Sequence, residues 1–260
     1  MQNQKSKIKN EKDRARRPFS NFAFCLLPCL TLAATFPLRA ITTNDLATAE
    51  REGRELAHQL CELRPEANFT NTGKLVIRIP KKPRQEIPFI SRILLTETNW
   101  TTVYEVTQGT NPPGDFSVEH RPATPNRYSL AGTTMLPNDQ TMTPFAGSDF
   151  WLADLGLEFF HWSAQRLWKQ EMRRGKSCQV LESRRPESWT NGYARVVSWI
   201  HTESGAVVQA EAYDARGKLL KEFRPTAVEK VNGAWQLKEM EIENVQTGSR
   251  TTLVFDLQPE

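Results

Sequence analysis

The sequence predicts a mainly β protein, in which an antiparallel sheet is accompanied by a few helices. The main observation is a series of alternating apolar runs between residues 193 and 257, separated by short breaks rich in Gly, Asn and Asp. One break is Asn232-Gly233, the strongest short hairpin signal in the chain, because both residues accept positive φ. The runs predict strands at Tyr193–His201, Val207–Tyr213, Leu219–Phe223 with an extension to Val231, Trp235–Asn244 and Thr251–Leu257.

The same alternation appears earlier in the chain, which extends the predicted sheet. The regions Gly109–Asn126 and Gly132–Phe145 are rich in Pro, Thr, Asn and Gly and indicate loops that contain only short strands. The further strands expected are Phe69–Ile79, Ile87–Glu97, Thr101–Thr107, short strands around Phe116–His120 and Tyr128–Leu130, Gln165–Arg173 and Ser177–Arg184, the last two joined at Arg174-Gly175.

Two helices are predicted to cover the apolar face of this sheet. Apolar residues at a spacing of three or four predict a helix over Asp45–Leu63, which ends before Pro65. The second helix is predicted over Ser148–Trp162, with Ser148 as its N-terminal cap. It is apolar on nearly every side, which fits either a buried core helix or a partly exposed lid over an apolar cavity, and the pattern leaves both open.

The first 40 residues have the features of a secretory signal. A basic segment precedes an apolar run from Phe19 to Phe36, and Leu38-Arg39-Ala40 ends in a small residue. The pattern predicts a signal peptide at residues 1–40, export to the periplasm and a single domain over residues 41–260. Two alternatives remain: a twin-arginine signal at Arg16-Arg17, and an uncleaved segment that anchors the protein in the membrane.

The charge of the predicted mature protein excludes nucleic acid as an expected partner. The 260-residue chain carries a net charge of +4, whereas residues 1–40 alone contain eight Lys or Arg and two Asp or Glu. The remaining residues therefore carry a net charge of −2, without the basic excess that binds phosphate backbones.

The predicted mature protein retains two cysteines, Cys61 and Cys178. Two thiols in an oxidising compartment most simply form one disulfide, which would join the first helix to the sheet. The alternative is two buried free thiols.

A search for catalytic or cofactor motifs finds none, so we predict no enzyme, no cofactor and no metal site. The four histidines lack metal-ligand spacing, and the chain has no CxxC, GxSxG, Walker or GxGxxG motif. Glu239, Glu241 and Glu243 alternate along one predicted strand and indicate a solvated outer face. An enzyme would require a cleft in which His161, Asp154 or Glu158 meets other polar groups.

Several segments of the second half resemble the outer-membrane lipoprotein-sorting proteins, the LolA/LolB-like group. The runs are "GYARVVSWI", "AEAYDARGKLLKEF" and "VNGAWQLKEMEIENVQTGSRTTLVF", preceded by "GSDF" at Gly147–Phe150. The matching features include Tyr193, Trp199, Lys221, Met240 and Thr251, and the resemblance covers Gly147–Leu257. It implies an incomplete, strongly curved antiparallel β-barrel with helices on its concave side. It also implies a non-enzymatic role, in which acyl chains lie between sheet and helices.

Two functions follow as hypotheses. The first is a monomeric periplasmic carrier whose cargo is a lipoprotein, another lipid or an apolar molecule. The second is a structural or interaction module of the cell envelope, with a filled core and a protein partner. The residues expected to line the cavity of a carrier are Leu56, Leu60, Trp151, Leu155, Phe159, Trp199, Val208, Ala210, Met240, Ile242, Leu253 and Phe255.

Overall fold

The computed structural model describes residues 46–106, 115–122, 124–130, 134–137, 140–187, 192–231 and 234–257. The predicted signal peptide, residues 1–40, lies outside the described residues, as does the predicted turn at Asn232-Gly233. No helix in the described part of the chain is both long enough and apolar enough to cross a membrane.

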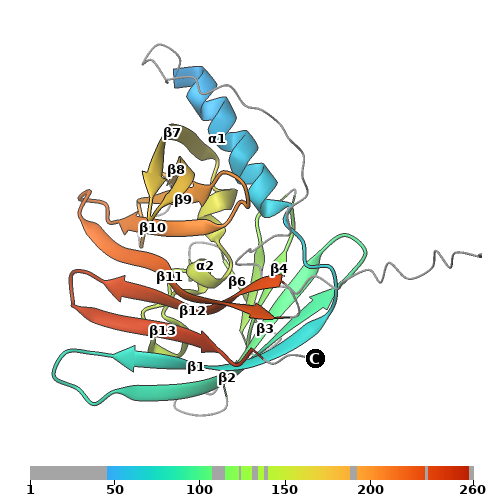
Figure 1. Cartoon of the computed structure of the whole chain (residues 1–260), viewed down its shortest axis with the longest axis vertical. Coiled ribbons are helices and arrows are strands. Elements are labelled where there is room, and N and C mark those ends of the chain that lie inside the picture. Colours follow the sequence, from blue (N-terminus) through green and yellow to red (C-terminus); the bar gives the residue numbers. More distant parts are fainter. Residues whose placement is uncertain are drawn as a thin grey trace, which may run out of the picture.

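A single antiparallel sheet of 13 strands forms the body of the molecule (Figure 1). The strands follow each other in the order β6-β5-β4-β3-β2-β1-β13-β12-β11-β10-β9-β8-β7, so the sheet is two meanders joined where β1 pairs with β13. The edge strands β6 and β7 do not pair, which leaves the curved sheet as an incomplete barrel. The strands are β1 Phe69–Arg78, β2 Gln85–Leu95, β3 Trp100–Val106, β4 Phe116–His120, β5 Arg127–Leu130, β6 Thr134–Leu136, β7 Ala164–Arg173, β8 Lys176–Arg184, β9 Arg195–His201, β10 Val207–Tyr213, β11 Leu219–Val231, β12 Ala234–Asn244 and β13 Ser249–Phe255.

These bounds confirm the predicted strands, whose ends differ from the observed ones by two residues or fewer. The short strand β6 is an addition, because three residues inside a loop-rich region carry too little alternation to be recognised. The predicted extension of the third meander strand to Val231 is present in β11.

The first helix, α1, spans Leu46–Cys61 and lies beside the edge strand β7 (Figure 1). Gly53 and Ala57 are its buried positions. A Cβ atom at position 53 would lie 2.6 Å from backbone atoms of Arg166 in β7, so only glycine allows this close approach.

The prediction of one continuous helix over Ser148–Trp162 is wrong. Between β6 and β7 the chain contains a 3₁₀ turn η2 (Phe145–Gly147), a one-turn helix α2 (Leu152–Leu155) and a second 3₁₀ turn η3 (Glu158–His161). Leu157 has φ 51° and interrupts the helix, and Ser148 accepts a hydrogen bond from the Phe150 N–H instead of capping a helix. We refer to residues 140–162 as the covering segment, because their apolar side chains pack against the concave face of the sheet and α2 lies inside its curve (Figure 1).

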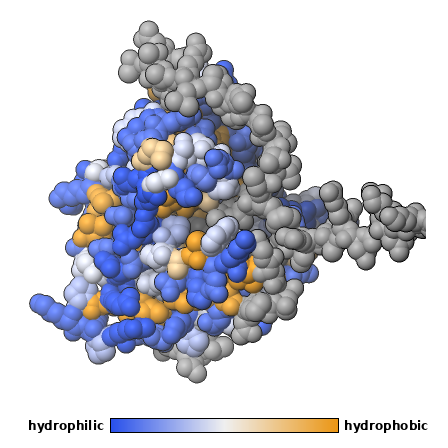
Figure 2. Space-filling view, viewed as in Figure 1, coloured by the Kyte–Doolittle hydropathy of each residue, from blue (hydrophilic) through white to orange (hydrophobic). Residues whose placement is uncertain are grey.

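The two faces of the sheet differ in chemistry. The concave face and the covering segment form one large apolar core, whereas the convex face carries ion pairs. Glu241 accepts a hydrogen bond from Arg224 at 2.7 Å and lies 3.6 Å from Arg250, and Glu243 pairs with Arg250 at 2.8 Å. Figure 2 shows one side of the molecule as mainly hydrophilic, with hydrophobic residues scattered among the polar ones.

Candidate functional site

Most of the predicted cavity residues meet on the concave side of the sheet. Ten of the twelve belong to one apolar core, either buried within it or packed against its margin: Leu155, Phe159, Ala210, Met240, Ile242, Leu253 and Phe255 are buried, and Leu56, Leu60 and Trp151 are partly buried.

The other two, Trp199 and Val208, lie on the opposite face of the sheet, which corrects their predicted placement. They belong to a separate apolar cluster with Cys178, Val180 and Val197. Trp199 shares its side of β9 with Val197, because residues two apart point the same way. In β10 a register shift between Val207 and Gln209 places Val207 on the concave side and Val208 on the convex side.

The two cysteines also lie on opposite faces, and the predicted disulfide between them is not formed. Both thiols are free. Cys61 packs against the concave core at the end of α1, whereas Cys178 is buried in the convex cluster. The sheet therefore separates the two sulfur atoms, which the spacing of the cysteines in the sequence could not reveal.

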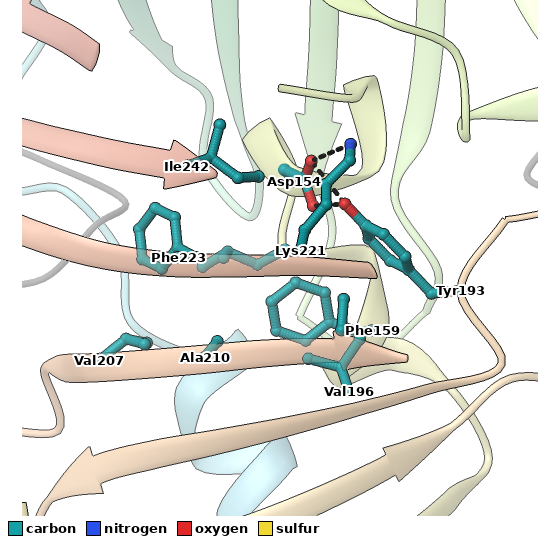
Figure 3. Close-up of a pocket in the computed structure, with 11 residues that line it drawn as sticks. Asp154, Phe159, Tyr193, Val196, Val207, Ala210, Lys221, Phe223 and Ile242 are labelled. Carbon is teal, nitrogen blue, oxygen red and sulfur yellow. Dashed lines mark hydrogen bonds and ion pairs between the residues drawn. The ribbon is translucent and has the colours of Figure 1, made fainter. Parts of the chain in front are cut away.

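A narrow cavity lies between the covering segment and the inner faces of β9 to β12 (Figure 3). Its volume is about 20 Å³, which is enough for a single water molecule but far below the several hundred Å³ of a typical ligand site. Its wall is mainly apolar, with three polar groups on one side: the lining residues are Asp154, Leu157, Phe159, Tyr193, Val196, Val207, Ala210, Ala212, Lys221, Phe223 and Ile242.

The polar groups form a buried cluster around Lys221. Its ammonium Nζ donates a hydrogen bond to the backbone oxygen of Asp149 at 2.6 Å and lies 3.8 Å from Oδ2 of Asp154. It also lies 3.5 Å from the centre of the Trp151 ring, a cation–π contact. The Tyr193 hydroxyl donates to the Asp154 carboxylate, at 2.9 Å from Oδ1 and 3.0 Å from Oδ2.

Burial dominates the electrostatics of this cluster. It lowers the pKa of the Lys221 ammonium to about 8, although Asp154 and Asp149 act in the opposite direction. It also raises the pKa of the Asp154 carboxyl, against the opposing effects of Lys221, the Trp151 N–H and the Tyr193 hydroxyl. Burial and the nearby Asp154 carboxylate together raise the pKa of Tyr193 well above its ordinary value.

Asp149 fixes the start of the covering segment to the last strand. Its Oδ1 accepts a hydrogen bond from Ser249 at 2.5 Å, and its Oδ2 accepts one from Thr251 at 2.8 Å. The Asp149 N–H in turn donates to Oγ1 of Thr251 at 2.9 Å. The "GSDF" run thus supplies the residue that attaches the covering segment to β13.

The far end of the covering segment is held by the first half of the sheet. The Tyr128 hydroxyl donates to Oε2 of the buried Glu158 at 2.7 Å, and Asn126 donates to the Gly156 carbonyl at 2.7 Å. Burial lowers the pKa of His120 to about 3 and that of His161 to about 4, so both imidazoles are neutral at pH 7.

Two of the three residues singled out for possible catalysis, Asp154 and Glu158, do meet other polar groups. Their partners are side chains of the protein, which hold the covering segment in place, and the adjoining cavity has no room for a substrate. Within the described residues, no group of three His, Cys, Asp or Glu side chains could hold a metal ion.

Sequence reasoning missed the role of Lys221, although a signal was present. Lys221 and Phe223 are two residues apart on one strand and therefore point to the same side, so the lysine had to enter the apolar face. The partners of Lys221 lie about 70 residues away in a segment of irregular backbone, and no sequence pattern identifies them.

Comparison with known proteins gives a consistent result at the level of the fold. A family model described as "-like: Uncharacterized protein" matches residues 129–257. A search of curated proteins gave no match.

Three solved structures share the architecture. A putative outer membrane lipoprotein-sorting protein domain from Vibrio parahaemolyticus has a TM-score of 0.66 and 21% identity, over 80% of this chain and 92% of that one. A DUF1329 family protein from Desulfovibrio piger has a TM-score of 0.62 and 16% identity, over 80% of this chain and 91% of that one. A LolA superfamily protein from Nitrosomonas europaea has a TM-score of 0.55 and 15% identity, over 80% of this chain and 92% of that one. The chain therefore shares the fold of these three structures, which confirms the fold that the resemblance in its sequence implies.

Proposed function

We propose that the protein is a non-enzymatic periplasmic carrier or binding protein for acyl ligands, either lipoproteins or other lipids. The observation that carries this proposal is the apolar concave face of an open 13-stranded sheet, covered by a segment whose helical elements are only three or four residues long. The fold shared with a putative lipoprotein-sorting domain supports it.

Ligand entry requires the covering segment to move. The cavity of about 20 Å³ cannot hold an acyl chain, whereas the concave face beneath the covering segment presents large apolar side chains such as Phe223, Met240 and Ile242. Transfer of an acyl chain from water onto such a surface is favourable by about 0.8 kcal/mol per buried methylene. On this proposal, the arrangement in which the covering segment packs against the concave face is the closed one.

Binding of a fluorescent fatty acid to the full chain tests this proposal, together with native mass spectrometry and organic extraction of protein purified from its own envelope. Ala210 lines the narrow cavity, so Ala210→Phe should occupy the binding space and reduce probe binding at least tenfold. Ala215 lies in an exposed turn, and Ala215→Phe is the matched control that should bind as the wild type does.

A second candidate function is an interaction module of the cell envelope with a filled core. The small cavity favours it, as does the edge strand β7, on which Trp168 is 46% exposed and Met172 is 66% exposed. Absence of extracted lipid, together with absence of probe uptake, would reject the carrier and leave this second function.

A further inference from the structure

The buried cluster around Lys221 joins two separate parts of the molecule. Lys221 lies in β11, and Tyr193 lies two residues before β9, so neither belongs to the covering segment. Their shared neighbour Asp154 belongs to the covering segment, and the two donor groups converge on its carboxylate (Figure 3). If the covering segment moves away from the sheet, it takes the carboxylate with it and leaves the donors behind.

Movement of the covering segment would leave the Lys221 ammonium without an acceptor. Its hydrogen-bond acceptor, the Asp149 carbonyl, and its ion-pair neighbour Asp154 both depart with the segment. The ammonium would then lie on an apolar surface formed by residues such as Phe223 and Ile242. An isolated charge in such surroundings is strongly unfavourable unless an anion accompanies it.

The covering segment has features that permit such movement. Many of its backbone N–H groups bond to carbonyls within the segment, for example Leu152 N–H to the Thr143 carbonyl and Ala153 N–H to the Thr141 carbonyl. The hydrogen bonds of Asp149 and Asp154 to residues outside the segment each involve at least one side chain. Ala146 and Leu157 bracket α2, and both have φ 51°, a left-handed conformation that is strained for residues other than glycine.

We propose that Lys221 and Tyr193 form the binding site for an oxyanion in the head group of an acyl ligand, and that Asp154 occupies this site when the protein is closed. The inference rests on the proposed carrier function and specifies the ligand class. The ligand carries a carboxylate or phosphate next to its acyl chain. In the loaded state its oxyanion accepts the two donors, and its chain lies along the apolar residues that now line the narrow cavity.

Paired ligands that differ only in the anionic group test the inference on the full chain. Oleate is compared with methyl oleate, and dioleoyl phosphatidic acid with dioleoylglycerol. We expect the wild type to bind the anionic member of at least one pair about tenfold more tightly, because hydrogen bonds to charged groups are the stronger ones. If only oleate is preferred over its neutral partner, the ligand class carries a free carboxylate. If only phosphatidic acid is preferred over its neutral partner, the ligand class carries a phosphate head group.

Three variants assign the effect to the proposed residues. Lys221→Met should bind the anionic and the neutral member of each pair with equal affinity, and Tyr193→Phe should reduce the preference for the anionic ligand without removing a charge. Asp154→Asn removes the competing carboxylate and should increase the affinity for the anionic ligand severalfold. Lys218 is exposed in the turn before β11, and Lys218→Met is the matched control, which should retain the wild-type preference.

The outcomes separate this inference from the function on which it rests. Equal affinity for charged and neutral ligands, or a preference that survives both Lys221→Met and Tyr193→Phe, would overturn the inference and leave the carrier intact. Failure of all four ligands to bind would overturn the inference, and together with the absence of extracted lipid it would overturn the carrier as well. Should Lys221→Met fail to fold, Tyr193→Phe and Asp154→Asn carry the test.

Discussion

The sheet and the covering segment are held in place by different kinds of hydrogen bond. Neighbouring strands are joined by continuous backbone ladders, such as the six pairs between β12 and β13. The covering segment is attached to the same sheet through side chains, with Asp149, Asp154 and Glu158 as acceptors. A ladder separates only when the strands separate, whereas a few side-chain hydrogen bonds can be exchanged for others. The comparison therefore predicts that the sheet carries most of the stability of the molecule and that the covering segment opens more readily than the sheet.

The largest expected effect comes from damage to the core of the sheet. Leu253 in β13 is fully buried on the concave side, and Leu253→Ala should lower the free energy of unfolding by about 3–5 kcal/mol through lost burial and a residual cavity. Urea denaturation measures the loss. Met172 is 66% exposed, so Met172→Ala should change the free energy by less than about 0.5 kcal/mol. Similar losses in both variants would show that the core is not where the stability lies.

Gly156→Ala should damage the covering segment instead of the sheet. Gly156 has an ordinary φ of −96°, but a Cβ atom there would lie 2.3 Å from the Tyr128 hydroxyl. The clash should cost about 1–3 kcal/mol and speed hydrogen exchange in residues 152–160, while β11 to β13 remain protected. Tyr128→Phe removes the hydroxyl and should recover part of the loss in the double variant. Uniform loss of protection across the sheet would contradict the separation of the two regions.

A low pH should destabilise both the sheet and the covering segment, because each contains a buried histidine. The pKa of His120 in β4 is lowered to about 3 and that of His161 in η3 to about 4, mainly by burial, whereas both titrate near 6.5 when unfolded. The unfolded chain therefore binds protons that the folded chain does not, and stability falls as the pH drops from 6.5 toward 4. Each histidine should account for about 2 kcal/mol at pH 5. Unfolding measured at pH 7 and pH 5 should show a smaller drop in His120→Gln, and an unchanged drop would contradict the prediction.

Thr251→Val tests a single attachment of the covering segment. It removes the hydroxyl that donates to Oδ2 of Asp149 and accepts from the Asp149 N–H, at little change in shape. The expected cost is about 1–2 kcal/mol, with faster exchange at residues 145–157. Thr252 is the adjacent residue on the opposite side of β13, so Thr252→Val is the matched control and should leave that exchange rate unchanged.

The smallest expected effect concerns the cysteines. Because Cys61 and Cys178 are free and lie on opposite faces, a mild oxidant should form no bond between them and should leave the Tm within about 1 °C. Burial also raises the pKa of the Cys61 thiol to about 12, which keeps it in the unreactive protonated form. Mass spectrometry of oxidised peptides would detect a Cys61–Cys178 link, and its presence would contradict the assignment of the two faces.

The same contrast between regions explains what could be predicted from the sequence. Strands with backbone ladders show a period of two, so β7 to β13 were located almost to the residue, and the inward direction of Met240 and Ile242 followed from alternation with glutamates. The covering segment shows no such period, because it is buried on most sides. Its apolar composition suggested a helix, whereas the positive φ of Leu157 divides it into short turns.

The site was predicted in outline but not in its chemistry. Composition and alternation identified most of the apolar lining. They could not reveal the bulge that places Val208 on the convex face, nor the partners of Lys221. Bulges and contacts between residues far apart in the sequence depend on the assembled fold. The resemblance to lipoprotein-sorting proteins pointed to Tyr193 and Lys221 as shared features, and the structure places both beside the same carboxylate.

Native-state hydrogen exchange of the wild-type protein tests the central claim most directly. At low denaturant concentrations, we expect residues 145–157 to exchange through an opening that exposes little surface and costs several kcal/mol less than global unfolding. Strands β1, β12 and β13 should exchange only through global unfolding. Equal opening free energies for the covering segment and these strands would show that the two regions unfold as one, and would contradict a cover that opens on an intact sheet.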